Sequence, residues 1–324
     1  MKIKDLVYGE EDTNEEVLID LINSKSIQRL KHLSQFGIPD EYYHKKTFSR
    51  YEHSLGVLIL LRRLNASLKE QIAGLLHDVS HTAFSHVIDW VIGKPEKEDY
   101  QDEILPEVIK NSEIPAILEK HNINYKDLLN FDNFTLLERE TPSLCADRID
   151  YALREMFYEN ETISIKEIFS DLNSKDGQIF FRKKEVAEIF AKEYSKLQKE
   201  HWGGNEAKAR YHILAEALRE GLRNKIINIS DMMKTDNEVI KILSDSNDDK
   251  IIKNLTLLKN GFIIKIEKDD ESIILRKKFR WIDPEVLIDN KIRNLSEISQ
   301  SYREFLEKQR EESTALIRVK IFAK

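Results

Sequence analysis

Three histidines and an aspartate lie within twelve mostly apolar residues, LLHDVSHTAFSH, at positions 75–86. A buried imidazole or carboxylate is costly unless it is paired or bound to a metal. The chain also offers His53 and Asp147, so imidazole and carboxylate ligands for one divalent ion are available. Neighbours on a helix diverge by about 100°, so His77 and Asp78 can share an ion only at the edge of their helix. Ordinary buried side chains remain the alternative.

Three helices are expected to carry these residues. SLKEQIAGLLHD, residues 67–78, has Ser67 and Glu70 in capping-box spacing and runs into the histidine-rich stretch. SRYEHSLGVLILLRRLN, residues 49–65, is apolar almost all round from Leu55 onward and places His53 near its beginning. Both patterns predict helices that are buried in the body of the protein.

The third predicted helix, TPSLCADRIDYALREMF, begins at Thr141 with Pro142 at its first position. Four ionisable or polar residues then share one face at helical spacing: Asp147, Asp150, Tyr151 and Arg154. A functional face and a solvated surface stripe explain this pattern equally well.

Beyond residue 160 the pattern changes. SKDG at 174–177 followed by QIFFRKK predicts a hairpin, and GFIIKIEKDDESIILRKKFRWIDP, residues 261–284, predicts two strands joined by a charged turn. A helix in NLSEISQSYREFLEKQREES and a final strand in ALIRVKIF follow. We therefore predict a mainly α protein, with a helical core at 1–160 and a smaller α+β part at 161–324, separated by a soft boundary.

Composition narrows the classes of function. The net charge of −7 disfavours nucleic acid as a stable partner, although a small phosphorylated ligand needs only a local basic pocket. The acidic N-terminal stretch and the single Cys145 favour a reducing cytoplasm, and the longest apolar run, residues 55–61, is too short for a membrane helix.

Two basic clusters have ordinary interpretations that we favour. The first, Arg276, Lys277, Lys278 and Arg280, is expected at the solvated edge of a strand. The second, Lys208, Arg210, Tyr211 and His212, could reach a ligand above the helical core, but a charged outer helix face explains it more simply. Trp202 and Trp281 fit core, interface or base-stacking positions equally well.

Three blocks together resemble a known family. RYEHSLGV at 50–57, LLHDVSHTAFSH at 75–86 and ADRIDYALRE at 146–155 resemble the HD-domain metal-dependent phosphohydrolases in identity, order and spacing. The resemblance covers roughly residues 25–160 and is greatest to the branch that includes the deoxynucleoside triphosphate triphosphohydrolases. It implies an HD-domain helical core and one divalent ion, for which Mn, Fe, Ni, Zn and Mg are candidates.

The resemblance also implies roles for single residues. The implied metal ligands are His53, His77, Asp78 and Asp147. His81 and His86 would face the substrate phosphates, and Asp89 would orient a histidine that acts as general acid. The implied substrate contacts are Arg50 to phosphate, Arg148 and Tyr151 to phosphate and sugar, and Gln35 to the sugar. A metal-activated water would then attack phosphorus while a histidine protonates the leaving oxygen.

The chain also departs from the family pattern. Ser80 and Ala83 stand where relatives commonly have Gly and Pro, which predicts a different loop between the histidines. A histidine expected before a glutamate falls at Lys97, before Glu98. This alignment implies that one catalytic group is missing or replaced by a fixed cation.

Other functions remain open. The acidic pair that follows the HD residues in alarmone hydrolases is replaced by Ser80-His81, and no Gly-Tyr-Pro element of the cyclic-dinucleotide phosphodiesterases is present. We expect a nucleotide phosphohydrolase with a single metal ion, most simply a deoxynucleoside triphosphate hydrolase acting as a homo-oligomer such as a dimer. The alternatives are a phosphodiesterase or phosphatase on another phosphate ester, and a non-catalytic nucleotide-binding regulator, which the change at Lys97 suggests.

Overall fold

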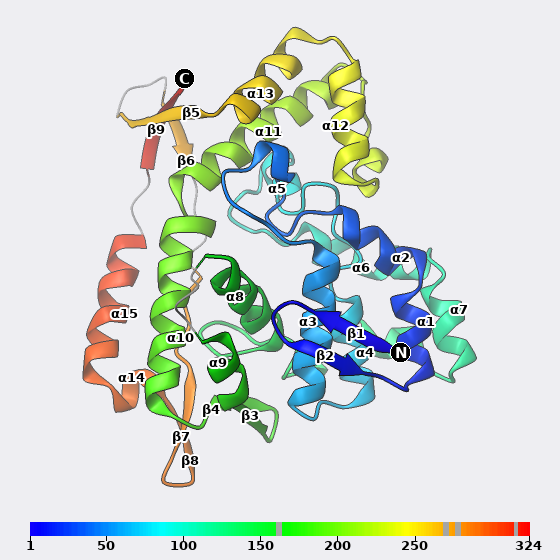
Figure 1. The fold of residues 1–324 in the computed structure, drawn as a ribbon. Helices are drawn as coiled ribbons and strands as arrows, with labels where there is room; N and C mark the ends of the chain where they lie inside the picture. The colour runs from blue at the N-terminus through cyan, green and yellow to red at the C-terminus, as the bar shows by residue number, and fades with distance from the viewer. Residues whose placement is uncertain (160–163, 268–271, 276–279, 314–316) are drawn as a thin grey trace.

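The computed structural model describes residues 1–159, 164–267, 272–275, 280–313 and 317–324 (Figure 1). The predicted fold class is confirmed, because helices dominate and most strands lie in the C-terminal half. The helices are α1 (Glu16–Ile22), α2 (Lys25–Arg29), α3 (Arg50–Arg63), α4 (Leu68–Leu76), α5 (Val87–Val91), α6 (Tyr100–Lys110), α7 (Ile114–Lys120), α8 (Ala146–Glu159), α9 (Ile165–Asp171), α10 (Lys184–Leu197), α11 (Asn205–Arg223), α12 (Asp236–Asp245), α13 (Asp249–Asn260), α14 (Leu295–Ile298) and α15 (Gln300–Ser313).

The strands form three separate sheets. A hairpin of β1 (Lys2–Asp5) and β2 (Gly9–Asp12) lies against α3 (Figure 1). A second sheet has the order β3-β4-β7-β8, and a third has the order β5-β9-β6. Their strands are β3 (Leu172–Lys175), β4 (Gln178–Phe181), β5 (Phe262–Ile266), β6 (Ile273–Leu275), β7 (Glu285–Ile288), β8 (Lys291–Asn294) and β9 (Ile317–Ala323).

Helix α3 is the centre of the helical core and packs against both α4 and α8. Its apolar run, residues 55–61, is buried throughout, as the all-round apolar pattern predicts. The helix begins with a capping box in which Ser49 Oγ accepts from the Glu52 amide and the Glu52 carboxylate accepts from the Ser49 amide. This cap fixes the first turn of α3, which carries His53.

Two sequence predictions about helix starts were wrong in detail. Helix α8 begins at Ala146 and not at Thr141, because the preceding backbone is bonded to other segments: Pro142 O accepts from the Asp283 amide at 2.9 Å. Ser67 caps α4 as expected, but Glu70 does not complete a capping box. Its carboxylate instead accepts from the amides of Leu136 and Leu137 at 2.7 and 3.0 Å, which anchors the segment that leads into α8.

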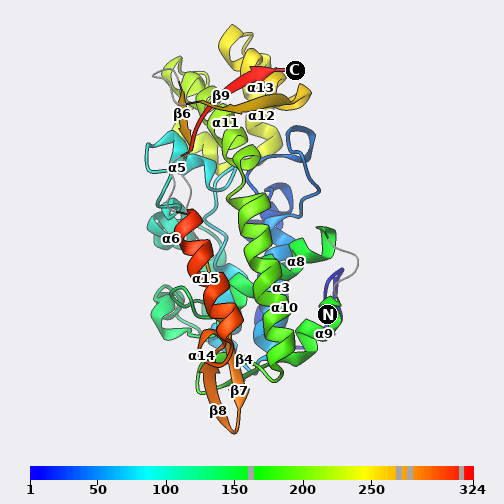
Figure 2. The same cartoon turned by 90° about the vertical axis from the view of Figure 1, so that its left-hand side faces the viewer.

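The C-terminal half joins the core through helices and strands, because α10 packs against α8 and because Ile179 of β4 and Val286 of β7 belong to the same apolar cluster as α3. The hairpin predicted at 174–177 is confirmed as β3 and β4, with Lys175 opposite Gln178. The two strands predicted within residues 261–284 are present as β5 and β6, but they are not neighbours, because β9 lies between them. The charged turn predicted between them falls outside the described residues. Figure 2 shows α10 and α11 running one after the other along the molecule.

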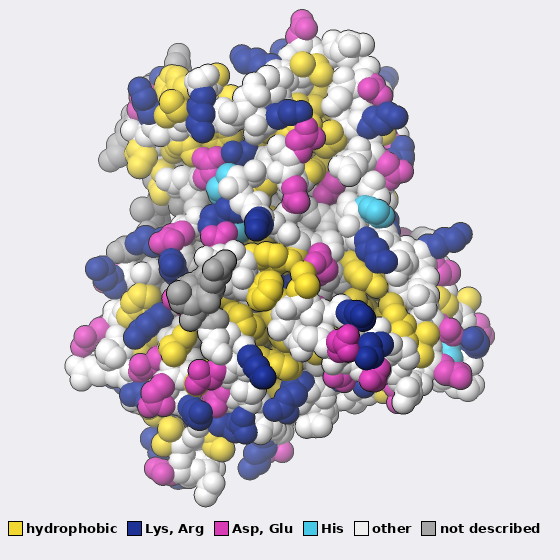
Figure 3. All heavy atoms as spheres, in the orientation of Figure 1, with side chains coloured by type: hydrophobic (Ala, Val, Ile, Leu, Met, Phe, Trp, Pro, Cys, Tyr) yellow, Lys and Arg dark blue, Asp and Glu magenta, His cyan; other side chains and the backbone are white. Residues whose placement is uncertain are grey.

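Apolar side chains form two clusters. The larger one combines α1, α3, α4 and α8 with α10 and Tyr302, so it includes residues on both sides of position 160. The smaller one packs α11, α12 and α13 against Phe84 in the histidine-rich stretch and against Val87 at the start of α5. No helix in the described part of the chain is long and apolar enough to cross a membrane. Figure 3 shows basic and acidic side chains interspersed over the visible face.

We predict that Ser49→Ala lowers the free energy of unfolding by about 1 kcal/mol, because it removes the side-chain acceptor at the start of α3. Urea denaturation followed by circular dichroism measures this change. Lys46→Ala, at an exposed position in the preceding loop, serves as the control and should leave the unfolding midpoint unchanged. Equal midpoints for both variants would show that the cap does not contribute.

Candidate functional site

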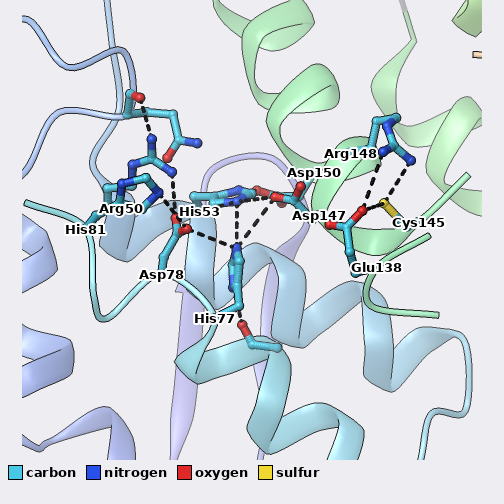
Figure 4. A network of polar contacts seen from close by, with 12 residues as sticks. Arg50, His53, His77, Asp78, His81, Glu138, Cys145, Asp147, Arg148 and Asp150 are labelled. Carbon is cyan, nitrogen blue, oxygen red and sulfur yellow. Dashed lines mark hydrogen bonds and ion pairs between the residues drawn. The ribbon is translucent and has the colours of Figure 1, made fainter. Parts of the chain in front are cut away.

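Four side chains from three helical segments converge at one point (Figure 4). Ligand atoms of His53, His77 and Asp147 all lie within 4.8 Å of one another. The two histidine Nε2 atoms are 3.2 Å apart, and Asp147 Oδ1 lies 2.9 Å from His53 Nε2. Asp78 completes the group, with Oδ1 3.4 Å from His77 Nε2 and Oδ2 3.8 Å from His53 Nε2. The site therefore joins the start of α3, the end of α4 and the start of α8.

Hydrogen bonds behind the histidines orient both rings. His53 Nδ1 donates to Asp150 Oδ2 at 2.7 Å, and His77 Nδ1 donates to Gly74 O at 2.7 Å. Each bond holds a proton on Nδ1 and leaves Nε2 to face the other ligand atoms. Metal-binding histidines almost always have such partners on the second nitrogen. The donor set therefore fits a divalent cation, and we call His53, His77, Asp78 and Asp147 the candidate metal-ligand group.

The charges of the four groups support the same fit. Burial lowers the pKa of His77, but the charges of Asp78 and Asp147 outweigh burial and raise it to about 9. Burial raises the pKa of Asp147, but hydrogen bonds to His53 and His77 outweigh burial and hold it below its usual range. The carboxylates therefore favour positive charge at the imidazoles, and a bound cation can replace the imidazole protons.

A buried chain of charges continues from His53 to the N-terminal hairpin. Asp150 accepts from Arg154 Nε at 2.8 Å, and Arg154 Nη2 donates to Asp5 Oδ2 at 2.6 Å. Gly56 on α3 faces this chain, and a Cβ there would collide with Asp150 and Arg154. Asp150, Tyr151 and Arg154 on this face of α8 are therefore buried, and Asp147 lines the cavity, so the surface-stripe interpretation is wrong.

The Asp78 carboxylate makes polar contacts with both Arg50 and His81. Arg50 Nη1 donates to Asp78 Oδ2 at 2.9 Å, and its other nitrogens donate to Ser85 Oγ and to the backbone oxygen of Gln35. His81 Nε2 lies 3.2 Å from Asp78 Oδ1. Burial, together with the charge of Arg50, lowers the pKa of His81 to about 3. His81 is therefore a neutral ring beside Asp78.

His86 lies one ring farther from the metal-ligand group. Its ring is perpendicular to that of His81, with centroids 5.0 Å apart. Its Nδ1 is 3.8 Å from Asp89 Oδ2, longer than a hydrogen bond. Asp89 also accepts from the amides of Asp99 and Tyr100, both at 3.3 Å. Burial lowers the pKa of His86 to about 3 and raises that of Asp89 to about 6.

The loop between the histidines is clamped by residues that the sequence pattern did not identify. Asp236 on α12 accepts from the amides of Phe84 and Ser34, both at 2.8 Å. Arg29 donates to the backbone oxygens of Val79 and His81 at 3.0 and 2.6 Å. Residues at the start of α12 and the end of α2 thus fix a loop in which Ser80 and Ala83 replace the usual Gly and Pro.

A cavity of about 650 Å³ opens beside the metal-ligand group. Gln35, Arg50, Arg148 and Tyr151 all line it, as do His77, Asp78, His81, His86 and Asp147. Arg148 is held at the rim, where Nη1 donates to Ser143 O at 2.6 Å. Tyr151 shares a 2.7 Å hydrogen bond with Tyr194. Further aromatic lining comes from Phe36, Tyr43, Phe131, Trp202 and Tyr211.

At the position of the expected further histidine, the structure contradicts one of the two sequence hypotheses, that of a fixed cation in the site. Lys97 is exposed, so it is not a fixed cation in the site, whereas Glu98 is buried and lines the cavity. Lys208 Nζ and Arg280 Nη2 bind the two oxygens of Glu98 at 2.9 and 2.6 Å. The solvated interpretations of Lys208 and Arg280 are therefore wrong, while the placement of 276–278 falls outside the described residues.

Comparison with known proteins decides the family. The HD domain family model matches residues 50–154. Protein YdhJ of Bacillus subtilis, described as uncharacterized, is 40% identical over 94% of this chain and 94% of its own length. The metal-dependent phosphohydrolase cns2 of Cordyceps militaris is 36% identical over 62% of this chain and 60% of its own length. A Dictyostelium discoideum homologue of the deoxynucleoside triphosphate triphosphohydrolase SAMHD1 is 24% identical over 90% of this chain and 62% of its own length. The chain belongs to the HD-domain family.

This HD-domain phosphohydrolase builds part of its site from outside the matched region. His53, His77, Asp78 and Asp147 all lie within residues 50–154. Asp5, at the far end of the buried charge chain, precedes that region, and Lys208 and Arg280 follow it. The HD domain thus supplies the metal-ligand group, while flanking segments supply its support and one wall of its cavity.

We predict that Gly56→Ala lowers divalent-metal affinity by about 10- to 100-fold, because the added Cβ displaces Asp150 from His53. Competition with a chromogenic chelator measures the affinity of the purified, folded variant. Arg63→Ala, at an exposed position on the same helix, is the control and should bind metal like the wild type. Full metal affinity in Gly56→Ala would contradict the proposed role of Asp150.

Proposed function

We propose that this chain hydrolyses a nucleotide at the site formed by α3, α4 and α8, with a deoxynucleoside triphosphate as the first candidate. One observation supports this most directly: a cluster fitted to a divalent ion opens into a cavity that also contains cationic and aromatic side chains. A nucleotide requires such contacts: a metal ion and cationic side chains for its phosphates, and aromatic side chains for its base. The SAMHD1 homologue, with 24% identity, supports the same class of substrate.

In this proposal His53, His77, Asp78 and Asp147 hold one divalent ion. Such an ion supplies an activated water as nucleophile and neutralises charge on the phosphate. Arg50 holds the Asp78 carboxylate in place and presents positive charge beside it. Arg148, fixed by the backbone oxygens of Ser143 and Arg139, presents a second guanidinium at the cavity wall. Gln35 and Tyr151 line the space left for the sugar.

We assign protonation of the leaving oxygen to His86 and not to His81. His81 Nε2 faces the ligand Asp78, whereas His86 lies one ring farther along and lines the cavity. The low pKa of His86 keeps it neutral in the absence of substrate. A bound phosphate brings negative charge beside the ring, which favours the protonated form needed for a proton donor. Asp89, with Oδ2 3.8 Å from His86 Nδ1, would orient the ring.

The proposal predicts that metal-loaded wild-type protein hydrolyses at least one member of a panel of ribo- and deoxynucleoside mono-, di- and triphosphates. The products identify the bond that is cut, because they are triphosphate, pyrophosphate or orthophosphate. Asp147→Ala should lose both metal and activity, because it removes one of four ligands, while the exposed control Asp127→Ala keeps both. No turnover by protein that demonstrably contains metal would contradict the proposal.

The assignment of His86 predicts that His86→Ala lowers kcat by at least about 100-fold while metal content stays at the wild-type level. Asp89→Asn should lower kcat less, because it only weakens the orientation of the ring. Steady-state kinetics on the best substrate of the panel, with metal analysis of each variant, measure both effects. Unchanged kcat in His86→Ala would exclude it as the proton donor.

A further inference from the structure

The cavity has a second charged group besides the metal-ligand cluster. Glu98, Lys208 and Arg280 form it, and we call these three residues the anion clamp. The carboxylate of Glu98 lies between the two cations, with 2.9 Å to Lys208 Nζ and 2.6 Å to Arg280 Nη2. The side chains of Glu98 and Lys208 are 4% and 6% exposed, whereas that of Arg280 is 28% exposed. The clamp is therefore rigidly paired inside the protein but accessible from the cavity.

The clamp has an excess of positive charge. Two cations share one carboxylate, and the nearby Arg50 is already paired with Asp78. Desolvated charge is costly unless it is compensated. The neighbouring His86 does not compensate it either, because an imidazole is neutral or positively charged, and burial holds this ring neutral. An anion bound from the cavity supplies the missing negative charge.

The remainder of the cavity directs an anionic substrate toward the clamp. Asp102 and Glu138 line the cavity beside the metal-ligand carboxylates. A polyanion that extended from the metal site toward these carboxylates would meet like charge. In the direction of His86 it instead meets Lys208 and Arg280.

We propose that the anion clamp binds a second phosphate group of the substrate, beyond the phosphate engaged at the metal site. This inference rests on the proposed nucleotide hydrolysis and makes molecules with at least two phosphates the preferred substrates. Lys208 and Arg280 bind the second phosphate, and Glu98 holds the two cations at a fixed separation. The clamp thereby distinguishes nucleoside di- and triphosphates from monophosphates.

A purely structural role for the same three residues predicts a different result. In a structural ion-pair network, Glu98 is a partner whose loss only destabilises the fold. In an anion clamp, the Glu98 carboxylate also competes with the ligand for the two cations. Glu98→Gln therefore separates the two roles, because it should weaken the fold in both cases but strengthen anion binding only in a clamp.

Calorimetric titration of the metal-loaded protein with inorganic tripolyphosphate tests the clamp without requiring turnover, with bound metal measured before and after. Lys208→Ala should weaken binding at least about tenfold, because a charge-assisted contact is lost. Lys208→Arg should restore part of it, and the exposed control Lys241→Ala should bind like the wild type. Glu98→Gln should bind more tightly and gain more thermal stability from tripolyphosphate than the wild type. Equal binding by Lys208→Ala and wild type, or no gain in Glu98→Gln, would overturn the inference.

Kinetics then connect the clamp to the reaction. Lys208→Ala should lower kcat/KM for a deoxynucleoside triphosphate at least about tenfold and leave that for the monophosphate within about twofold. Equal losses of kcat/KM on both substrates would show that the clamp does not bind a second phosphate. The two proposals fail separately: protein that hydrolyses no nucleotide but loses tripolyphosphate binding in Lys208→Ala keeps the clamp and refutes the proposed reaction.

Discussion

The buried hydrogen bond between His53 and Asp150 is the contact on which the rest of the site depends. It orients the imidazole so that Nε2 faces His77 and Asp147, and it requires α3 and α8 to approach closely. Gly56 permits that approach because a side chain there would occupy the space of Asp150 and Arg154. Arg154 in turn compensates the charge of Asp150 and is itself paired with Asp5. A charged pair this deeply buried is stable only when every member has a partner.

The same helices create an electrical asymmetry in the cavity. Carboxylates gather around the metal-ligand group, whereas Lys208 and Arg280 lie beyond His86, where Glu98 only partly neutralises them. Neutral His81 and His86 separate the two regions, and burial keeps them uncharged in the absence of substrate. In the proposed reaction, a substrate phosphate placed between the regions would change the field at His86 and would thereby link binding to proton transfer.

Local sequence determined much of the metal-ligand group. His53, His77, Asp78 and Asp147 were identified because helical spacing and family-like blocks place ionisable residues in apolar surroundings, and the structure brings all four together. The supporting residues Asp5, Arg29 and Asp236 could not be identified in this way. Each acts across more than 45 positions of the chain, and no local pattern distinguishes it from a surface charge.

The errors in the sequence predictions have a common physical cause. Lys208 and Arg280 belong to charge-rich segments that are typical of solvated faces, yet both bind Glu98, which is more than 100 positions away from each. The start of α8 was misplaced because backbone bonds to Leu136 and Asp283 compete with the helix before Ala146. Tertiary contacts overrode local preference in each case.

X-ray absorption spectroscopy of the purified, metal-loaded protein, combined with elemental analysis, tests the central claim most directly. The account predicts one divalent ion per chain with two imidazole nitrogens at about 2.1 Å and carboxylate oxygens completing the shell. A spectrum with no imidazole scattering, or a protein that binds no divalent ion, would contradict it.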